Sequence, residues 1–202
     1  PGIFREYDIR GIWDEDLTAV SVRAIGRAFA FYLKNTLSKE RLTVTVGRDV
    51  RLSSPEVFLH LTEGLLESGI DVIDVGVCPT PLQYFSLYKL NADGGIMITG
   101  SHNPPEYNGM KLTVGRETIH GAKIRDIRRL TEDGSSVRGN GRMHSHNIIP
   151  EYIAQMKDAF KGFEKIKVVV DAGNGTGGLV APALLRELGC DVVELFCEPD
   201  GT

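Results

Sequence analysis

Residues 99–111 read Thr-Gly-Ser-His-Asn-Pro-Pro-Glu-Tyr-Asn-Gly-Met-Lys. The apolar run 95–98 comes directly before them and predicts a buried strand. Glycine and proline then interrupt regular structure, so we expect a loop that carries the Ser101 hydroxyl out of the core. Gly100 has no Cβ and would let a large group approach the backbone closely. The segment therefore predicts a serine that faces a ligand at the end of a strand.

The end of this segment predicts a return strand. Asn108-Gly109 is typical of a tight turn, and we expect it to lead into a short strand over residues 110–114. This return would place Lys111 beside Ser101. Because such a strand runs antiparallel to the one before it, we expect a mixed sheet rather than a purely parallel one.

Strand and helix patterns alternate over the rest of the chain. Apolar periodicity and β-branched runs predict helices over 20–33, 54–69, 80–90 and 122–130, and strands over 42–46, 71–75 and 95–99. We expect Thr18 or Ser21 to cap the first helix and Ser54 to cap the second. This order predicts an α/β fold, with a layered mixed β-sheet and helices on both faces.

Residues 134–148 lack periodicity and are rich in Gly, Ser and Asn, which predicts a loop and a domain boundary. We place a first domain at residues 1–140 and a second at 149–202. The second would consist of helices 150–160 and 179–188 and strands 166–170 and 191–196. This is fewer strands than a typical sheet contains, so we expect the truncated first half of a domain. Its bare sheet edge favours a homo-oligomer formed through this incomplete domain.

Composition argues against several classes of function. The 202 residues are 42% hydrophobic and 25% charged, and the net charge of −4 offers no basic surplus for a nucleic-acid backbone. No apolar run approaches the roughly 20 residues that span a bilayer, and the N-terminus has no signal-peptide pattern. The three cysteines lack C-x-x-C spacing, which indicates reduced thiols. We expect a cytoplasmic protein that binds neither nucleic acid nor membrane.

A second glycine-rich segment, 173–178, satisfies G-x-G-x-x-G between a predicted strand and a predicted helix. This context is typical of dinucleotide-binding turns and would make the chain a nucleotide-dependent oxidoreductase. The Asp171 carboxylate at the strand end would repel a pyrophosphate. We therefore favour a structural glycine turn.

Four segments, taken in order, resemble the motifs of one enzyme family. They are residues 4–11, 47–55, 99–111 and 171–178. The serine loop resembles the phosphoserine loop of the α-D-phosphohexomutases, in the phosphomannomutase/phosphoglucomutase group. The sequence of residues 104–109 favours this group over the phosphoglucosamine mutases. Since family members are longer and have more domains, the resemblance implies phosphohexomutase domain I followed by a truncated domain II, an N-terminal fragment.

The resemblance also implies a chemistry. In this family the serine at the Ser101 position carries a phosphoryl group and exchanges it with hexose phosphates, so that phosphate moves between positions 1 and 6 of mannose or glucose. Hexose 1,6-bisphosphate is the intermediate and activator. Mg²⁺, which prefers oxygen ligands, would bind Ser101 through its phosphate. The Asp-Gly-Asp-Gly-Asp metal loop of the family does not occur in this sequence. We therefore expect the Asp ligands to be absent and the fragment alone to be inactive.

The same resemblance assigns roles to residues around the serine. Lys111 matches a lysine that transfers protons, and Arg10 matches an arginine that holds phosphoryl oxygens. His102, next to the serine, completes the catalytic set. Tyr7 and Asn103 are assigned to substrate binding.

These assignments have simpler alternatives. Arg10 would equally pair with Asp8 or Asp14 at the surface. A further charged group has the pattern of a surface ion network: Arg48, Asp49 and Arg51. For the whole chain, the alternatives are a non-catalytic module that binds sugar phosphates, or a phosphoglucosamine mutase.

Overall fold

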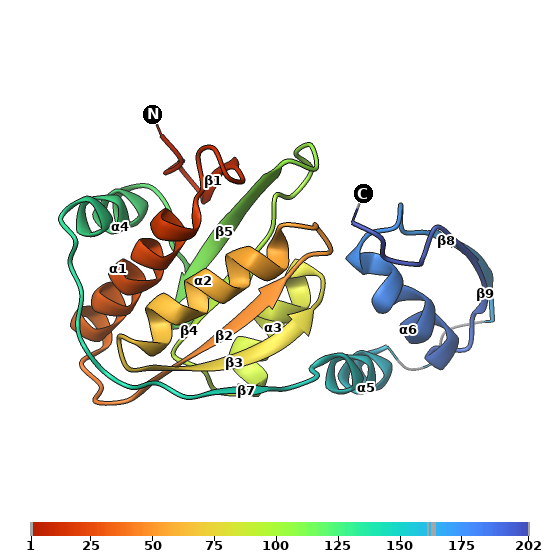
Figure 1. Ribbon diagram of the computed structural model, residues 1–202. Helices are drawn as coiled ribbons and strands as arrows, with labels where there is room; N and C mark the ends of the chain where they lie inside the picture. Colours follow the sequence, from red (N-terminus) through yellow and green to blue (C-terminus); the bar gives the residue numbers. More distant parts are fainter. Residues whose placement is uncertain (1, 161, 163–164, 202) are drawn as a thin grey trace.

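The strand that precedes the serine loop lies inside a central sheet (Figure 1). The computed structural model describes residues 2–160, 162 and 165–201. Its strands are β1 (Ile9–Ile12), β2 (Leu42–Arg48), β3 (Ile70–Val77), β4 (Gly94–Ile98), β5 (Tyr107–Val114), β6 (Glu117–Thr118), β7 (Met143–Ser145), β8 (Lys167–Asp171) and β9 (Asp191–Leu195). Its helices are α1 (Ala19–Leu37), α2 (Ser54–Leu66), α3 (Thr80–Lys89), α4 (Ala122–Glu132), α5 (Ile149–Ala159), the 3-10 turn η1 (Thr176–Leu179) and α6 (Ala181–Glu187).

The main sheet has the order β1-β5-β4-β2-β3-β7, and β6 pairs with β5. β2 runs parallel to β3 and β4, and β7 runs parallel to β3, whereas β5 is antiparallel to both β4 and β1. Helices α1, α2 and α4 pack on one face of this sheet, and α3, with α5 beside it, packs on the other (Figure 1). The predicted α/β fold with a layered mixed sheet is confirmed.

The first helix shows how the sequence sets the packing. The apolar stripe of α1, which includes Val22, Phe29 and Leu33, is buried against the sheet. Thr18 caps the helix, because its Oγ1 accepts the Ser21 N–H at 3.2 Å and the Ser21 Oγ accepts the Thr18 N–H at 2.9 Å. This reciprocal capping box fixes the start of the helix. The expectation of a cap at Thr18 is confirmed.

The predicted turn at Asn108-Gly109 is wrong. Both residues lie inside β5, where Gly109 is paired with Arg10 of β1. A Cβ at Gly109 would collide with the Ile9 carbonyl oxygen, so glycine at this position permits close approach of two strands rather than a chain reversal. The chain turns back earlier, within residues 99–106, so the serine loop itself is the connection between β4 and β5.

The start of α2 also differs from the prediction. Ser53, not Ser54, precedes the first helical residue, and its side chain makes no capping hydrogen bond. The buried Ser54 hydroxyl donates instead to Asp49 Oδ1 at 2.6 Å. A helix-start serine is thus used to bind the loop that leads out of β2.

The segment 134–148, expected to be a loop, contains the edge strand β7. Its residues Met143, His144 and Ser145 pair in parallel with β3. All three residues are exposed, so the sequence shows no alternation of apolar and polar residues that would predict a strand here. The strand forms because it pairs with β3. The boundaries proposed for two domains, 1–140 and 149–202, stay a prediction.

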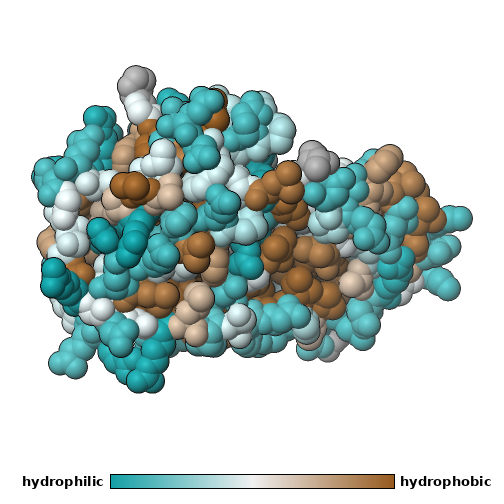
Figure 2. All heavy atoms as spheres, viewed as in Figure 1, coloured by the Kyte–Doolittle hydropathy of each residue, from teal (hydrophilic) through white to brown (hydrophobic). Residues whose placement is uncertain are grey.

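The last unit is small and apolar on its surface. β8 and β9 form a separate parallel pair, with η1 and α6 between them in sequence. Several large apolar side chains are exposed there: Val169, Val193, Leu195 and Phe196. Figure 2 shows hydrophobic surface over this end of the molecule. Within the described residues, no helix combines the length and the hydropathy that crossing a membrane requires.

Candidate active site

Two loops meet at one edge of the main sheet. β2 and β4 are parallel neighbours, so their carboxyl ends lie at the same edge, where open α/β sheets bind ligands. The loop after β2 begins at Asp49, whose N–H donates to the Ile98 carbonyl at 2.9 Å. The serine loop begins directly after Ile98. Residues about 50 positions apart in sequence are thereby held side by side.

Ser101 lies at the exposed tip of this edge. Its φ of 58° is in the left-handed region, which is unusual for a residue with a Cβ. The Ser101 N–H donates to Thr99 Oγ1 at 2.9 Å, and the Ser101 Oγ lies 3.3 Å from His102 Nδ1. Strained backbone of this kind persists only where surrounding contacts hold it, and it concentrates at functional sites.

A cavity of about 570 Å³ opens beside Ser101. All the site residues that we predicted from sequence line it: Tyr7, Arg10, Ser101, His102, Asn103 and Lys111. The N-terminal residues reach the cavity because β1 pairs with β5, and Lys111 reaches it from β5. The structure thus brings together residues from three parts of the sequence, and the separate roles that we assigned to them stay predictions.

The charges in this cavity are organised by Asp8. Arg10 Nη2 donates to Asp8 Oδ2, and Lys111 Nζ donates to the same oxygen at 3.2 Å. Arg10 Nη1 also donates to Asn103 Oδ1 at 2.6 Å. Arg5, Arg10 and Lys111 face two carboxylates, Glu6 and Asp8, which leaves one excess positive charge on the lining.

Asp8 is a site residue that our sequence analysis did not include. Its side chain is buried, and it is the partner of Arg10, whereas Asp14 is not among the ion pairs of the described residues. The two-residue spacing of Asp8 and Arg10 could have indicated this pair, because side chains two positions apart in an extended chain point to the same side.

One donor in the site has no partner. Arg10 Nε is buried and makes no hydrogen bond within the described part of the chain. A buried donor left unpaired costs about 1–3 kcal/mol. An anionic oxygen in the cavity is the kind of acceptor that a guanidinium favours.

No group of three or more His, Cys, Asp or Glu side chains suited to a metal ion occurs in residues 2–160, 162 and 165–201. The prediction that Ser101 binds Mg²⁺ through its phosphate stays a prediction.

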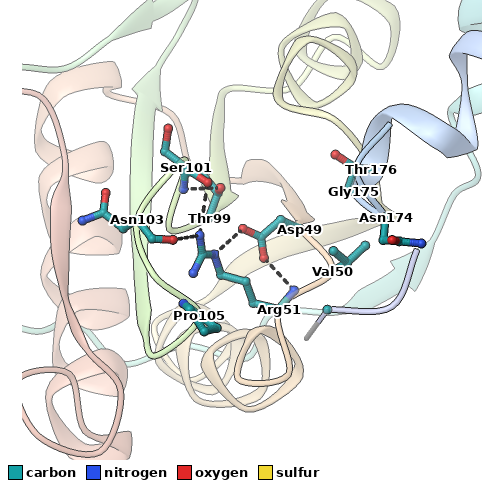
Figure 3. A pocket seen from close by; sticks show the side chains of 12 residues that line it. Asp49, Val50, Arg51, Thr99, Ser101, Asn103, Pro105, Asn174, Gly175 and Thr176 are labelled. Carbon is teal, nitrogen blue, oxygen red and sulfur yellow. Dashed lines mark hydrogen bonds and ion pairs between the residues drawn. The ribbon is translucent and has the colours of Figure 1, made fainter. Parts of the chain in front are cut away.

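The glycine segment 173–178 lies across a second cavity, of about 330 Å³, from the serine loop (Figure 3). Gly178 packs so closely on the Cys197 carbonyl that a Cβ would overlap it. The Asp171 carboxylate accepts the Gly173 N–H at 2.9 Å. These contacts give the glycines a packing role and support the structural interpretation of the segment.

Family models match most of the chain. The model for phosphoglucomutase/phosphomannomutase, alpha/beta/alpha domain I, matches residues 1–138, and the model for alpha/beta/alpha domain II of the same family matches residues 150–202.

Individual relatives agree with these matches. A phosphomannomutase/phosphoglucomutase of Pseudomonas aeruginosa is 43% identical over 199 residues, covering 98% of this chain and 42% of the relative. A phosphoglucomutase of Neisseria meningitidis is 40% identical over 202 residues, covering 99% and 43%. The crystal structure of a phosphoglucomutase/phosphomannomutase family protein from Burkholderia thailandensis superimposes with a TM-score of 0.91 at 39% identity, covering 98% of this chain and 44% of that chain. The chain therefore spans less than half the length of these relatives.

Proposed function

Because the chain belongs to the phosphoglucomutase/phosphomannomutase family, we propose that the complete protein is a phosphosugar mutase whose phosphoryl carrier is Ser101. It moves phosphate between positions 1 and 6 of mannose or glucose. The observation that carries this proposal is an exposed serine, in a strained backbone conformation, at the rim of a cavity lined by Arg10 and Lys111.

The proposed reaction consists of two transfers. In the first, the bond between phosphorus and Ser101 Oγ breaks, a new bond forms to a hexose-phosphate hydroxyl, and that hydroxyl loses its proton. The net movement of the proton is from that hydroxyl to the serine oxygen, and His102 Nδ1, 3.3 Å from Ser101 Oγ, and Lys111 in the same cavity are the candidate carriers that take it up and deliver it. In the second, the hexose 1,6-bisphosphate turns around and returns its other phosphate to Ser101.

Arg10 supplies the positive charge that phosphoryl oxygens need. Phosphoryl transfer depends mainly on positioning and on electrostatic stabilisation of the equatorial oxygens. The unpaired Nε of Arg10 would find its acceptor in such an oxygen. Tyr7, which is exposed and lies near His120 with 6.2 Å between ring centroids, would contact the sugar from the rim.

Mg²⁺ is part of the proposal for the complete protein. When bound, it would neutralise charge on the transferring phosphate. Residues 1–202 lack the Asp-rich loop that the resemblance implies, so we propose that this chain alone does not catalyse the mutase reaction. Mutase activity from this purified chain would contradict that proposal.

Replacement of the nucleophile tests the function. In the complete protein, Ser101→Ala should lower kcat by at least about a thousandfold, because covalent catalysis by the serine is lost. Ser136→Ala, which alters an exposed serine in the segment after α4, should leave kcat unchanged. Normal turnover by Ser101→Ala would exclude the proposed role.

The same variants separate a mutase from a module that only binds sugar phosphates. Calorimetry with glucose 1,6-bisphosphate should detect binding in either case. Intact-mass analysis should find a phosphoryl adduct on the wild type and none on Ser101→Ala only if the serine is the carrier.

We also propose that the exposed β8–β9 pair mediates association with a second copy of the chain. Its support is that β8 and β9 pair only with each other among the residues that the structure describes, together with exposed apolar side chains such as Val169. Light scattering that finds only monomers of the 202-residue chain up to high micromolar concentration would contradict this association.

A further inference from the structure

The serine loop is wrapped around one side chain of a neighbouring loop. The Arg51 guanidinium donates hydrogen bonds to three backbone carbonyls of the serine loop and to the carbonyl of the first residue of β5. They belong to Ser101 (3.1 Å), Asn103 (2.6 Å), Pro104 (2.6 Å) and Tyr107 (3.0 Å). Figure 3 shows the guanidinium inside the loop, with the Ser101 hydroxyl pointing away from it.

Arg51 has no donor left for a substrate. A guanidinium has five N–H groups. The Nε–H is taken by Asp49 Oδ2 at 3.2 Å, and the other four are taken by these carbonyls. The Arg51 side chain is only 12% exposed. The side chain lines the cavity of about 330 Å³, but every guanidinium N–H is directed at Asp49 or at a backbone carbonyl, so its contacts are those of a residue that acts through the loop.

Asp49 completes the attachment of the loop. Its Oδ2 accepts the Gly100 N–H at 3.2 Å, while its Oδ1 accepts the Arg51 N–H at 3.1 Å and the Ser54 hydroxyl at 2.6 Å. Asp49 is 13% exposed. The carboxylate thus orients the guanidinium and also binds the residue directly before the serine.

Gly100 is the position that makes this arrangement possible. A Cβ at Gly100 would lie 2.5 Å from Arg51 Cζ and 2.8 Å from the Tyr107 carbonyl oxygen. Such distances do not occur between real atoms, so any other residue would push the guanidinium out of the loop. The absence of a side chain at Gly100 therefore lets the Arg51 guanidinium pack against the backbone, in addition to any ligand that approaches there.

We propose that Arg51, oriented by Asp49, is a positioning residue for phosphoryl transfer at Ser101. This inference rests on the proposed function. A left-handed backbone at a residue with a Cβ is strained, and contacts from outside the residue must offset that strain. The loop carbonyls would otherwise turn to water, and the Ser101 Oγ would leave its place in the cavity that Arg10 and Lys111 also line. Reaction rates fall steeply when reacting groups are misplaced by about 1 Å.

The test uses the complete protein with Arg51→Ala and Arg51→Lys. We expect kcat to fall about a hundredfold in both, with KM within about threefold of wild type, because the substrate contacts remain. A lysine has the charge but cannot reach four carbonyls, so the conservative change should not restore activity. Guanidinium ion at non-denaturing concentration should restore at least tenfold activity to Arg51→Ala, whereas methylammonium should not.

The matched control is Arg41→Ala. Arg41 also pairs with an aspartate, Asp71, at 3.0 Å, but it stands at the opposite end of β2. We expect its kcat to be unchanged. Hydrogen exchange of the amides in residues 99–107 gives a second reading that does not depend on activity: it should accelerate in Arg51→Lys and not in Arg41→Ala.

The outcomes separate this inference from the proposed function. If Ser101→Ala is inactive while Arg51→Lys keeps normal kcat and normal exchange, the positioning role is wrong and the mutase function stands. If Arg51→Ala raises KM in proportion to its loss of kcat/KM, Arg51 binds substrate and the inference is also wrong. Should Arg51→Ala fail to fold, Arg51→Lys decides by the same two measurements.

Discussion

The backbone of Ser101 occupies a region in which a Cβ is strained, and this gives a prediction at the residue scale. Ser101→Gly and Ser101→Ala both lack the hydroxyl, but only glycine relieves the strain. We expect Ser101→Gly to exceed Ser101→Ala by about 1 kcal/mol in free energy of unfolding. Urea denaturation measures this difference.

The control for that pair is an exposed helix position. Gln155 lies within α5 and is exposed. There the order should reverse, with Gln155→Gly less stable than Gln155→Ala by about 1 kcal/mol. The same order at both positions would mean that the Ser101 backbone is not strained in solution.

Asp8 gives a second prediction at this scale. Asp8→Asn removes the negative charge that holds Arg10 and Lys111 together. In the complete protein we expect kcat to fall at least about tenfold while KM does not rise, because the excess positive charge still attracts phosphate. Steady-state kinetics measures both parameters. The control is Asp14→Asn, whose kcat and KM should equal those of the wild type. An increase in KM with unchanged kcat would mean that Asp8 serves substrate binding.

Single residues also mark how far sequence reasoning reaches. Motif and spacing were sufficient to select residues that line one cavity, among them Arg10 and Lys111. They were sufficient only in part for Arg51, which we interpreted as part of a surface ion network: its ion pair with Asp49 is present, but the guanidinium is largely buried in the serine loop. Its pairing with Asp49 is local and visible in sequence, but four of its five hydrogen bonds go to backbone carbonyls 50 or more positions away. Every residue has a backbone carbonyl, so no pattern of side chains in the sequence predicts which carbonyls Arg51 will bind.

At the element scale, α1 and α2 are joined by a charged contact that responds to pH. Glu67 accepts hydrogen bonds from Arg27 and from Arg23, and these bonds lower the pKa of the Glu67 carboxyl from 4.5 to about 2. A depressed pKa in the folded state means that the contact stabilises the protein above pH 4.5. The stabilisation is lost as the pH falls from 4.5 towards 2.

Glu67→Gln tests this linkage. At pH 7 we expect the variant to be less stable than wild type by about 1 kcal/mol, because solvent screens a contact at this partly exposed site. The difference should shrink through the range from pH 4.5 to pH 2. Glu40→Gln, at an exposed position before β2, should show no such pH-dependent difference. If the difference in free energy of unfolding between Glu67→Gln and wild type stayed constant down to pH 2, ionisation of Glu67 would not be its cause.

Elements with strong periodicity were predictable and those created by pairing were not. The apolar stripe and the Thr18 cap gave α1, and β-branched alternation gave β2. β7 and the first half of β5 depend on partners, since Gly109 becomes a strand residue only where β1 approaches it. A dipeptide typical of turns was overridden by this nonlocal contact.

At the scale of the whole molecule, the serine loop and the glycine turn of the last unit face one cavity (Figure 3). The loop after β2 lies between them. Arg51 of this loop holds the serine segment, and the Val50 carbonyl lies against Gly201. The alternation of strands and helices predicted both units, but it contained no information about this junction.

The contact at Gly201 leaves the two units without slack relative to one another. Its φ of 75° and the Val50 carbonyl beside it leave no room for a side chain. A larger residue there would displace Val50, and with it the neighbouring Arg51, which holds the serine loop. The geometry of the first unit is therefore coupled mechanically to the second through this close backbone contact, and we expect a side chain at position 201 to affect the serine loop.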